Sequence, residues 1–143
     1  MHTGILSPSA EEANKALIRN WVAAADSGFP PDFEDFFTKD YRGHLSGRTH
    51  MDLKELERLE RGFARAFNPV VRTIEDLLAI GDRVVLRLTS NARHTGEWQG
   101  IPATDRSVTF TAMVIYRIEQ GRIAESWGEV DFAGLWRQLT AAS

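Results

Sequence analysis

Among the four histidines of this sequence, His44 is the candidate for carrying a proton in a reaction near neutral pH. It lies three residues after Tyr41, in a segment with glycines at positions 43 and 47. An imidazole titrates close to neutral pH and can act as a general base. His44 is therefore the predicted catalytic residue if the protein is an enzyme. A surface or locally hydrogen-bonded histidine is the alternative.

The other acid–base candidates fit structural roles better. His94 ends a strand-like segment beside a Thr-Gly pair, so we expect its ring to make a hydrogen bond that closes the following loop. Glu125, Glu129 and Asp131 alternate along one face of a later strand. That pattern is typical of a solvated or interface face, although Asp131 at the strand end could also turn towards a pocket mouth.

The sequence contains no pattern of metal or cofactor binding. It has no Cys, no two His or carboxylates at metal-ligand spacing on one element, and no Gly-rich phosphate loop. We therefore expect neither a metal nor a cofactor.

Length and composition predict one globular domain. The chain has 143 residues, of which 43% are hydrophobic and 26% charged. Residues 1–8 are predicted to be a flexible tail and 9–143 the domain. The net charge of −3 disfavours nucleic acid or an anionic membrane as a partner. Without a signal-peptide pattern or a long apolar run, a cytoplasmic location is the expectation.

Apolar residues at helical spacing predict three helices in the first half of the chain. The first covers residues 10–26 and the second, which is short, covers 32–37. The third begins after Asp52, whose side chain is expected to form a capping box with Glu55. The Asn68-Pro69 pair should end it, because the residue before a proline disfavours helix.

The second half of the chain changes to strand periodicity. Alternating apolar and polar residues predict antiparallel strands that bury one face. Helices followed by strands indicate an α+β fold, with the three helices packed on a mostly antiparallel sheet. The predicted elements after the first helices are an irregular segment at 41–47, strands at 70–80, 83–94, 108–118 and 122–131, and a short helix at 132–139.

Small side chains gather on one face of the last two predicted strands. These residues are Ala112, Ala124, Ser126 and Gly128. Protein interiors are close-packed, so small residues in a sheet indicate either a helix packed very closely or a hole. A ligand pocket against this hairpin is one interpretation, and tight helix-on-sheet packing is the other.

The opposite face of the same strands is apolar in places. Apolar side chains on the side away from the helices need cover, so we expect a homodimer through this face, with Arg87, Arg93 and Glu129 near its rim. The predicted contact residues are Met113, Ile115, Ile123 and Trp127.

Residues 10–140 resemble the SnoaL-like polyketide cyclase family. The motifs that carry the resemblance are Gly81-Asp82-Arg83-Val84, His94-Thr95-Gly96, Gly100-Ile101-Pro102, Tyr116-Arg117-Ile118, Gly121-Arg122-Ile123, Glu125 two before Trp127, Asp131 with Gly134-Leu135, and more loosely Tyr41 three before His44. The resemblance implies a cone-shaped, nuclear-transport-factor-like fold, with a curved sheet wrapped around helices and an interior pocket. Family cyclases are understood to close a ring by cofactor-free acid–base catalysis, using an Asp and His on the pocket face of the last strands.

The corresponding positions in this chain are Ala112, Val114, Ser126 and Gly128, and none of them is an acid or a base. His44 then remains as the base, with Tyr41, Ser126 or Tyr116 as hydrogen-bond donors to a developing oxyanion. The predicted pocket lining is Trp21, Phe37, Tyr41, His44, Phe63, Leu88, Ser90, Phe110, Ala112, Val114, Ser126 and Gly128.

Three functions stay open at this point. The first is a cofactor-free cyclase or isomerase that acts on a hydrophobic, carbonyl-bearing substrate of polyketide type. The second is a non-catalytic binder of a small apolar molecule. The third is a dimeric interaction module whose cavity is incidental. Because one fold can serve many functions, the pocket has to decide among them.

Overall fold

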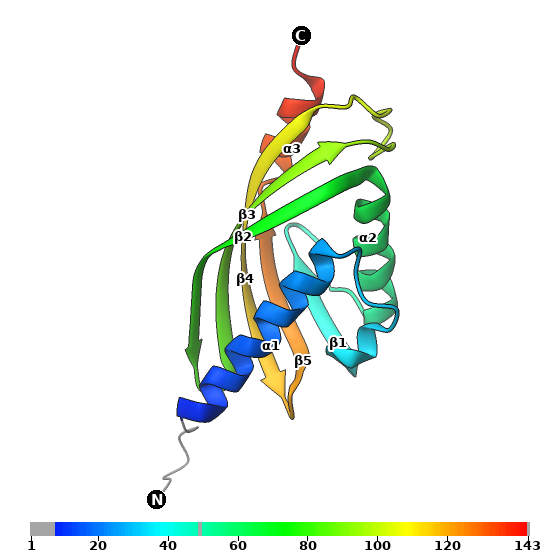
Figure 1. Ribbon diagram of the computed structural model, residues 1–143. Coiled ribbons are helices and arrows are strands. Elements are labelled where there is room, and N and C mark those ends of the chain that lie inside the picture. Colours follow the sequence, from blue (N-terminus) through cyan, green and yellow to red (C-terminus); the bar gives the residue numbers. More distant parts are fainter. Residues whose placement is uncertain (1–7, 49, 143) are drawn as a thin grey trace, which may run out of the picture.

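The computed structural model describes residues 8–48 and 50–142. One curved five-stranded sheet holds helices across its concave side, so the predicted α+β class is confirmed (Figure 1). In chain order the elements are α1 (Pro8–Asp26), a 3-10 turn (Phe33–Asp35), β1 (Phe37–Leu45), α2 (Leu53–Ala66), β2 (Phe67–Ile80), β3 (Arg83–His94), β4 (Ser107–Glu119), β5 (Arg122–Val130) and α3 (Phe132–Thr140).

The sheet has the order β1-β5-β4-β3-β2. Strands β2 to β5 pair antiparallel with their neighbours, whereas β1 runs parallel to β5 at one edge. The first strand of the chain therefore lies beside the last. This pairing brings the Tyr41 hydroxyl group of β1 within 2.7 Å of the Ser126 hydroxyl group of β5.

Two sequence predictions near β1 were wrong. The expected helix at 32–37 is only a 3-10 turn, capped by the Asp32 side chain, which accepts the Glu34 N–H at 2.8 Å. The expected irregular segment at 41–47 is mostly strand. Phenylalanines at 33, 36 and 37 have helical spacing, but Phe37 and Tyr41 are both buried on one face of an extended strand. The pairing with β5 decides this conformation, and that partner lies about 80 residues further along the chain.

Helix α2 follows its local sequence signals closely. Asp52 accepts the Glu55 N–H at 2.9 Å and Glu55 accepts the Asp52 N–H at 3.4 Å, which confirms the predicted capping box. The helix ends at Ala66, immediately before β2 begins. The helix packs against β1 and β2 and so covers the interior from that side (Figure 1).

Helix α1 crosses the concave side of the sheet beside β2 (Figure 1). Near its start, Glu11 accepts the Gly81 N–H at 2.8 Å, and at its end Asp26 pairs with Arg72 at 2.8 Å. The helix begins at Pro8, two residues before the predicted start, so position 8 belongs to the helix and not to the tail. The rest of the predicted tail, residues 1–7, lies outside the described residues.

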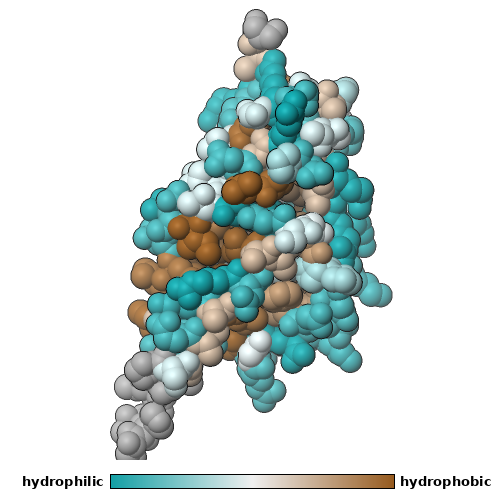
Figure 2. Space-filling model, in the orientation of Figure 1, coloured by the Kyte–Doolittle hydropathy of each residue, from teal (hydrophilic) through white to brown (hydrophobic). Residues whose placement is uncertain are grey.

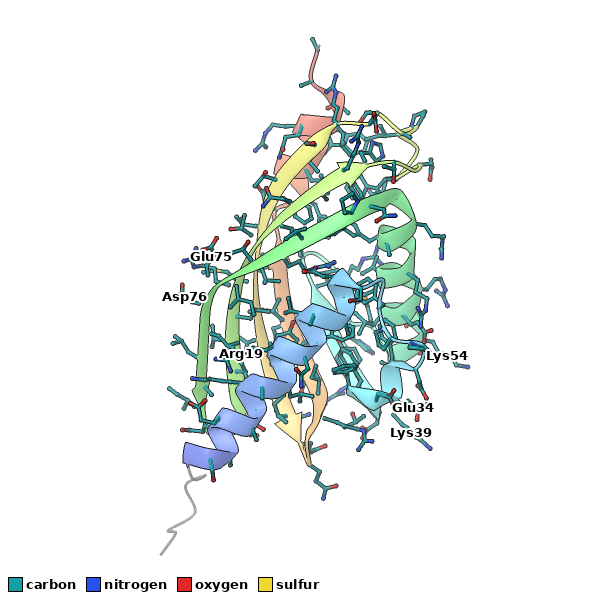
Figure 3. The ribbon with its side chains drawn as sticks, in the orientation of Figure 1. Arg19, Glu34, Lys39, Lys54, Glu75 and Asp76 are labelled. Atoms are coloured by element: carbon teal, nitrogen blue, oxygen red, sulfur yellow. The ribbon has the colours of Figure 1, made fainter. Side chains whose placement is uncertain are left out.

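Strand β2 bends sharply halfway along its length. Its pairing with β3 is irregular between Ile74 and Asp76. Figure 3 shows Glu75 and Asp76 at this bend, pointing away from the helices. Their partners lie on the outer face of β3: Thr89 donates to Glu75 at 2.6 Å and Arg87 to Asp76 at 2.7 Å. The bend curves the sheet around the helices.

The alternating faces of the sheet separate core from surface. On β3, Val84, Leu86 and Leu88 are buried, whereas Val85 and Arg87 between them are exposed. Figure 2 shows apolar surface along the edge that the second half of β2 forms beside α1. The exposed large apolar side chains are Val71, Leu78, Ile80, Val85, Met113, Ile115 and Trp136.

The placement of Ile123 on the outer face was wrong. The β4–β5 pairing shifts register between Arg117 and Ile118, and Ile118 then pairs with Ile123. A bulge of this kind interrupts the alternation of faces. Ile123 is consequently fully buried in the core, whereas Trp127, beyond the bulge, is only half-buried.

Candidate functional site

A cavity of about 380 Å³ lies between the concave face of the sheet and the helices. Its wall includes every residue of the lining predicted from the sequence. These are Trp21 from α1; Phe37, Tyr41 and His44 from β1; Phe63 from α2; Leu88 and Ser90 from β3; Phe110, Ala112 and Val114 from β4; and Ser126 and Gly128 from β5.

The small residues of the hairpin contribute to this hollow. In the β4–β5 pairing, Val114 lies opposite Gly128 and Ala112 opposite Val130. All four of these residues line the cavity. Ala124 does not line it, because it is buried near the other end of β5. Small side chains thus leave space in the middle of the sheet, where larger ones would fill the core.

Glu60 is the acidic group of the cavity wall, and the sequence prediction missed it. It lies half-buried on α2 among apolar lining residues, with Leu56 one turn before it and Phe63 one turn after it. Burial raises the pKa of the Glu60 carboxyl group, and the positive charge of Arg72 offsets this only in part. A signal was present in the sequence, because Glu60 interrupts the apolar stripe of an otherwise amphipathic helix.

Two hydroxyl groups meet on the sheet side of the cavity. The Tyr41 and Ser126 oxygens are 2.7 Å apart and buried. Burial raises the pKa of Tyr41 to about 12, and the hydrogen bond with Ser126 and the charges of Glu60 and Glu125 act on it as well. Tyr41 therefore stays protonated at neutral pH. Because the pair has two hydroxyl hydrogens and uses one between its members, the other can be donated to a ligand.

Tyr116 is a further phenol in the wall. Burial raises its pKa, and the neighbouring Tyr41 phenol and Glu60 carboxyl group act in the same direction. Tyr41, Glu60 and Tyr116 all line the cavity, and the charge of Glu60 raises the pKa of both tyrosines.

Gly43 makes room for the Tyr41 ring. A Cβ atom built on Gly43 would lie 2.8 Å from the Tyr41 Cζ atom, so a side chain at position 43 would force the Tyr41 ring to move. The absent side chain at Gly43 therefore lets the tyrosine lie along its own strand and reach Ser126.

His44 borders the cavity, but its imidazole is engaged on the outer face of the sheet. The Nε2 atom is 2.8 Å from the Glu125 carboxylate, and the ring stacks on Trp127 with centroids 5.5 Å apart. Glu125 and Trp127 alternate with Ser126 and Gly128 along β5, so they project from the opposite face. The hydrogen bond from His44 has the largest effect on the pKa of Glu125, and together with the hydrogen bond and charge of Arg117 it holds this pKa below its usual range, against the effect of burial.

His94 has the structural role that was predicted for it. Its Nδ1 accepts the Thr104 N–H at 3.1 Å, which closes the loop after β3. Asp131 is also structural, because its side chain caps α3 by accepting the Gly134 N–H at 2.9 Å. Neither residue lines the cavity.

Among the described residues, no group of three or more His, Cys, Asp or Glu side chains is arranged to hold a metal ion. In the same part of the chain, no helix is long and apolar enough to cross a membrane.

A cone of curved sheet closed by helices around a cavity defines the nuclear-transport-factor-like class of α+β domains. Within that class the chain belongs to the SnoaL-like polyketide cyclase family, whose model matches residues 15–139. The predicted resemblance is therefore confirmed. No curated protein matches the sequence.

Solved structures support the fold. TsrD from Streptomyces laurentii has 28% identity and a TM-score of 0.80, covering 96% of this chain and 99% of its own. AclR from Streptomyces galilaeus, provisionally named a hydroxylase, has 24% identity and a TM-score of 0.83, covering 92% of this chain and 83% of its own. IdmH from Streptomyces antibioticus, provisionally named a polyketide cyclase, has 24% identity and a TM-score of 0.78, covering 88% and 97%. The different names among these relatives agree with a fold that hosts several activities.

Proposed function

We propose that the cavity binds a mainly hydrophobic small molecule with a carbonyl group, and that Glu60 transfers a proton to or from it without a cofactor. The observation that supports this is a carboxyl group with a raised pKa in the wall of an apolar cavity. A raised pKa brings a carboxyl group closer to neutral pH, where general acid–base catalysis is most efficient. The family name and the name given to IdmH favour a polyketide-like substrate.

The proposed reaction is the closure of a ring within one molecule. The Glu60 carboxylate takes a proton from the carbon beside a carbonyl group, and the electron pair of that C–H bond moves to form an enolate. The enolate carbon then attacks a second carbonyl group of the same substrate, forming a C–C bond. The oxygen of this second carbonyl takes the proton back from Glu60, so the carboxylate is regenerated.

The hydroxyl groups supply hydrogen-bond donors, which a carboxylate lacks. A hydrogen bond from the Tyr41–Ser126 pair to the carbonyl oxygen would stabilise the charge of the enolate. Arg72 is anchored by Asp26 at 2.8 Å and lies near enough to influence the pKa of Glu60. It would limit the cost of a charged carboxylate in this site. The volume of about 380 Å³ lies within the ~300–1,000 Å³ usual for small-molecule sites.

The test uses a simple hydrophobic ketone, 2-tetralone, in deuterated buffer. NMR would follow the exchange of its α-protons with and without the protein. We expect faster exchange with the protein, and a loss of ~10²–10⁴-fold of this acceleration in Glu60→Gln, as is typical when a general base is removed. The matched control is Glu57→Gln, on the same helix, where Glu57 pairs with Arg61 at 2.8 Å and does not line the cavity.

Binding can be measured separately by quenching of tryptophan fluorescence, because Trp21 and Trp98 line the cavity. If 2-tetralone binds but exchanges no faster than in buffer, the catalytic proposal fails and the protein acts as a binder. If 2-tetralone neither binds nor exchanges, the proposed ligand class is wrong as well.

A further inference from the structure

The cavity has a mouth that differs chemically from its interior. Of the described residues in its wall, only Arg48 and Gln99 are exposed, and the others are buried or half-buried. Most of the interior wall is aromatic or aliphatic. A ligand that fills the cavity would therefore leave one end beside a guanidinium group and an amide.

The backbone that carries Arg48 is fixed by hydrogen bonds. The Arg48 N–H donates to the Leu45 oxygen at 2.7 Å and closes a turn after β1. Ser46 holds this turn against β5, because its N–H donates to the Gly128 oxygen at 3.0 Å and its Oγ accepts the Val130 N–H at 3.0 Å. The start of the Arg48 side chain is therefore held at the mouth.

The charge of Arg48 has no partner within the described part of the chain. No hydrogen bond or ion pair connects its guanidinium to another of these residues. The other arginine of the wall, Arg72, is different, because it pairs with Asp26. Arg48 is thus a cation at the entrance of an apolar cavity, and its guanidinium forms no ion pair with any other residue that the structure describes.

Gln99 adds a second donor at the mouth. It forms the tip of a tight turn in which Trp98 and Ile101 exchange backbone hydrogen bonds at 3.0 and 2.9 Å. Gln99 has a φ of 48° and Gly100 a φ of 84°. A positive φ is uncommon in a residue other than glycine. A similar pair of φ values occurs in the Gln120-Gly121 turn, so the conformation belongs to the turn, and this turn places the Gln99 amide in the cavity wall.

We propose that the ligand carries a carboxylate at the end that stays at the mouth, and that Arg48 binds it there with help from the Gln99 amide. This inference rests on the proposed function, because it assumes that a hydrophobic ligand fills the cavity. A guanidinium group matches the geometry of a carboxylate and can bind it through two hydrogen bonds. The substrate class is therefore a hydrophobic keto acid in preference to its ester.

The experiment compares anthraquinone-2-carboxylic acid with its methyl ester, measured by tryptophan quenching. The two probes share one apolar ring system and differ in charge. We expect wild-type protein to bind the acid about tenfold more tightly than the ester at low ionic strength, as one charge-assisted hydrogen-bonded contact allows. Added salt should weaken binding of the acid and leave binding of the ester unchanged.

Arg48→Gln should abolish this preference and leave the affinity for the ester unchanged. Arg58→Gln, an exposed arginine on α2 outside the cavity wall, should behave like the wild type. If Arg48→Gln weakens both probes equally, or if the wild type shows no preference for the acid, the carboxylate proposal is wrong although the cavity still binds ligands. If neither probe binds, the proposed ligand binding itself fails.

Discussion

The two faces of one sheet differ more than any other two regions of this molecule. The concave face carries small, aromatic and aliphatic side chains around a cavity, and burial in this cavity raises the pKa of Glu60 on helix α2, which covers that face. The convex face carries arginines and carboxylates, and hydrogen bonds there lower the pKa of Glu125. Alternate residues of the same strands build both faces. The pKa of a carboxyl group in this protein therefore depends on whether the group faces the cavity, as Glu60 does, or the convex surface, as Glu125 does.

The convex face is not uniformly polar. Leu78, Val85, Ile115 and Trp127 pair in register from β2 to β5 and form an apolar row across the strands. A groove of about 400 Å³ lies along part of this row and includes Met113 in its wall. Many charges beside the row are already paired within the chain, as Arg87 is with Asp76 at 2.7 Å.

We propose that this apolar row pairs with the same row of a second copy. A two-fold dimer places one patch against itself, and internally paired charges reduce the repulsion between copies. Leu78 and Val85 replace Ile123 in the predicted contact, because Ile123 is buried in the core.

The strongest test of the difference between the faces is stability. Leu86 and Val85 are neighbours on β3; Leu86 is fully buried and Val85 is 38% exposed. Leu86→Ala is expected to lower the free energy of unfolding by about 2–5 kcal/mol, because it removes buried apolar contacts and leaves a void. Val85→Ala should change it by less than about 0.5 kcal/mol when both variants are compared at a protein concentration low enough to keep the chain monomeric. Urea denaturation of the two variants measures this, and equal losses would contradict the assignment of faces.

The second prediction concerns the apolar row. Ile115→Glu should place an unpaired charge in the proposed dimer contact and raise its dissociation constant at least about tenfold, because an unpaired charge in an interface costs several kcal/mol. Thr109→Glu, exposed on the same strand but away from the row, is the control. Sedimentation at micromolar concentration measures both, and a monomeric wild type would refute the dimer.

Local signals in the sequence predicted much of this fold. The Asp52–Glu55 capping box and the alternation of β3 depend on residues close together in the chain, so a pattern can find them. The residues that line the cavity were also predictable. Alternation assigns strand residues to one face of the sheet or the other, and the family resemblance implied an interior pocket.

Features that depend on distant contacts were missed. Strand β1 is strand because β5 pairs with it, and Ile123 turns inward because a bulge shifts the register. Glu60 was overlooked for another reason: a charged residue on an amphipathic helix usually faces solvent. The structure shows that Glu60 instead lines the cavity beside α2.

The third prediction compares the two glutamates by pH. The raised pKa of Glu60 means that the folded protein binds its proton more tightly than the unfolded chain does. Its contribution to stability is therefore present below the usual glutamate pKa of about 4.3 and is lost as the pH rises through the folded-state value. Glu60→Gln should stabilise the protein at pH 7 relative to wild type, and this gain should vanish in acid.

Glu125 should behave in the opposite way. Its pKa is lowered in the folded state, so its stabilising contribution is present above the usual pKa and is lost as the pH falls through the folded-state value. Glu125→Gln should cost about 1 kcal/mol or less at pH 7, since the group is near the surface. Thermal unfolding of both variants and the wild type, from acid to pH 7, measures these differences in stability. If the stability differences of the two variants changed with pH in the same direction, the cavity and the convex face would not differ electrostatically.

The smallest expected effect is that of His44→Ala on proton transfer. The imidazole is hydrogen-bonded to Glu125 and stacked on Trp127, so it would act on the cavity only indirectly, by holding β1 against β5. We expect the variant to reduce the exchange of 2-tetralone less than about tenfold, against the ~10²–10⁴-fold expected for loss of a general base. His50→Ala, exposed beyond the end of β1, controls for removal of a ring. A loss in His44→Ala as large as that in Glu60→Gln, with a rate that depends on pH near a histidine pKa, would identify His44 as the base and reverse the assignment made to Glu60.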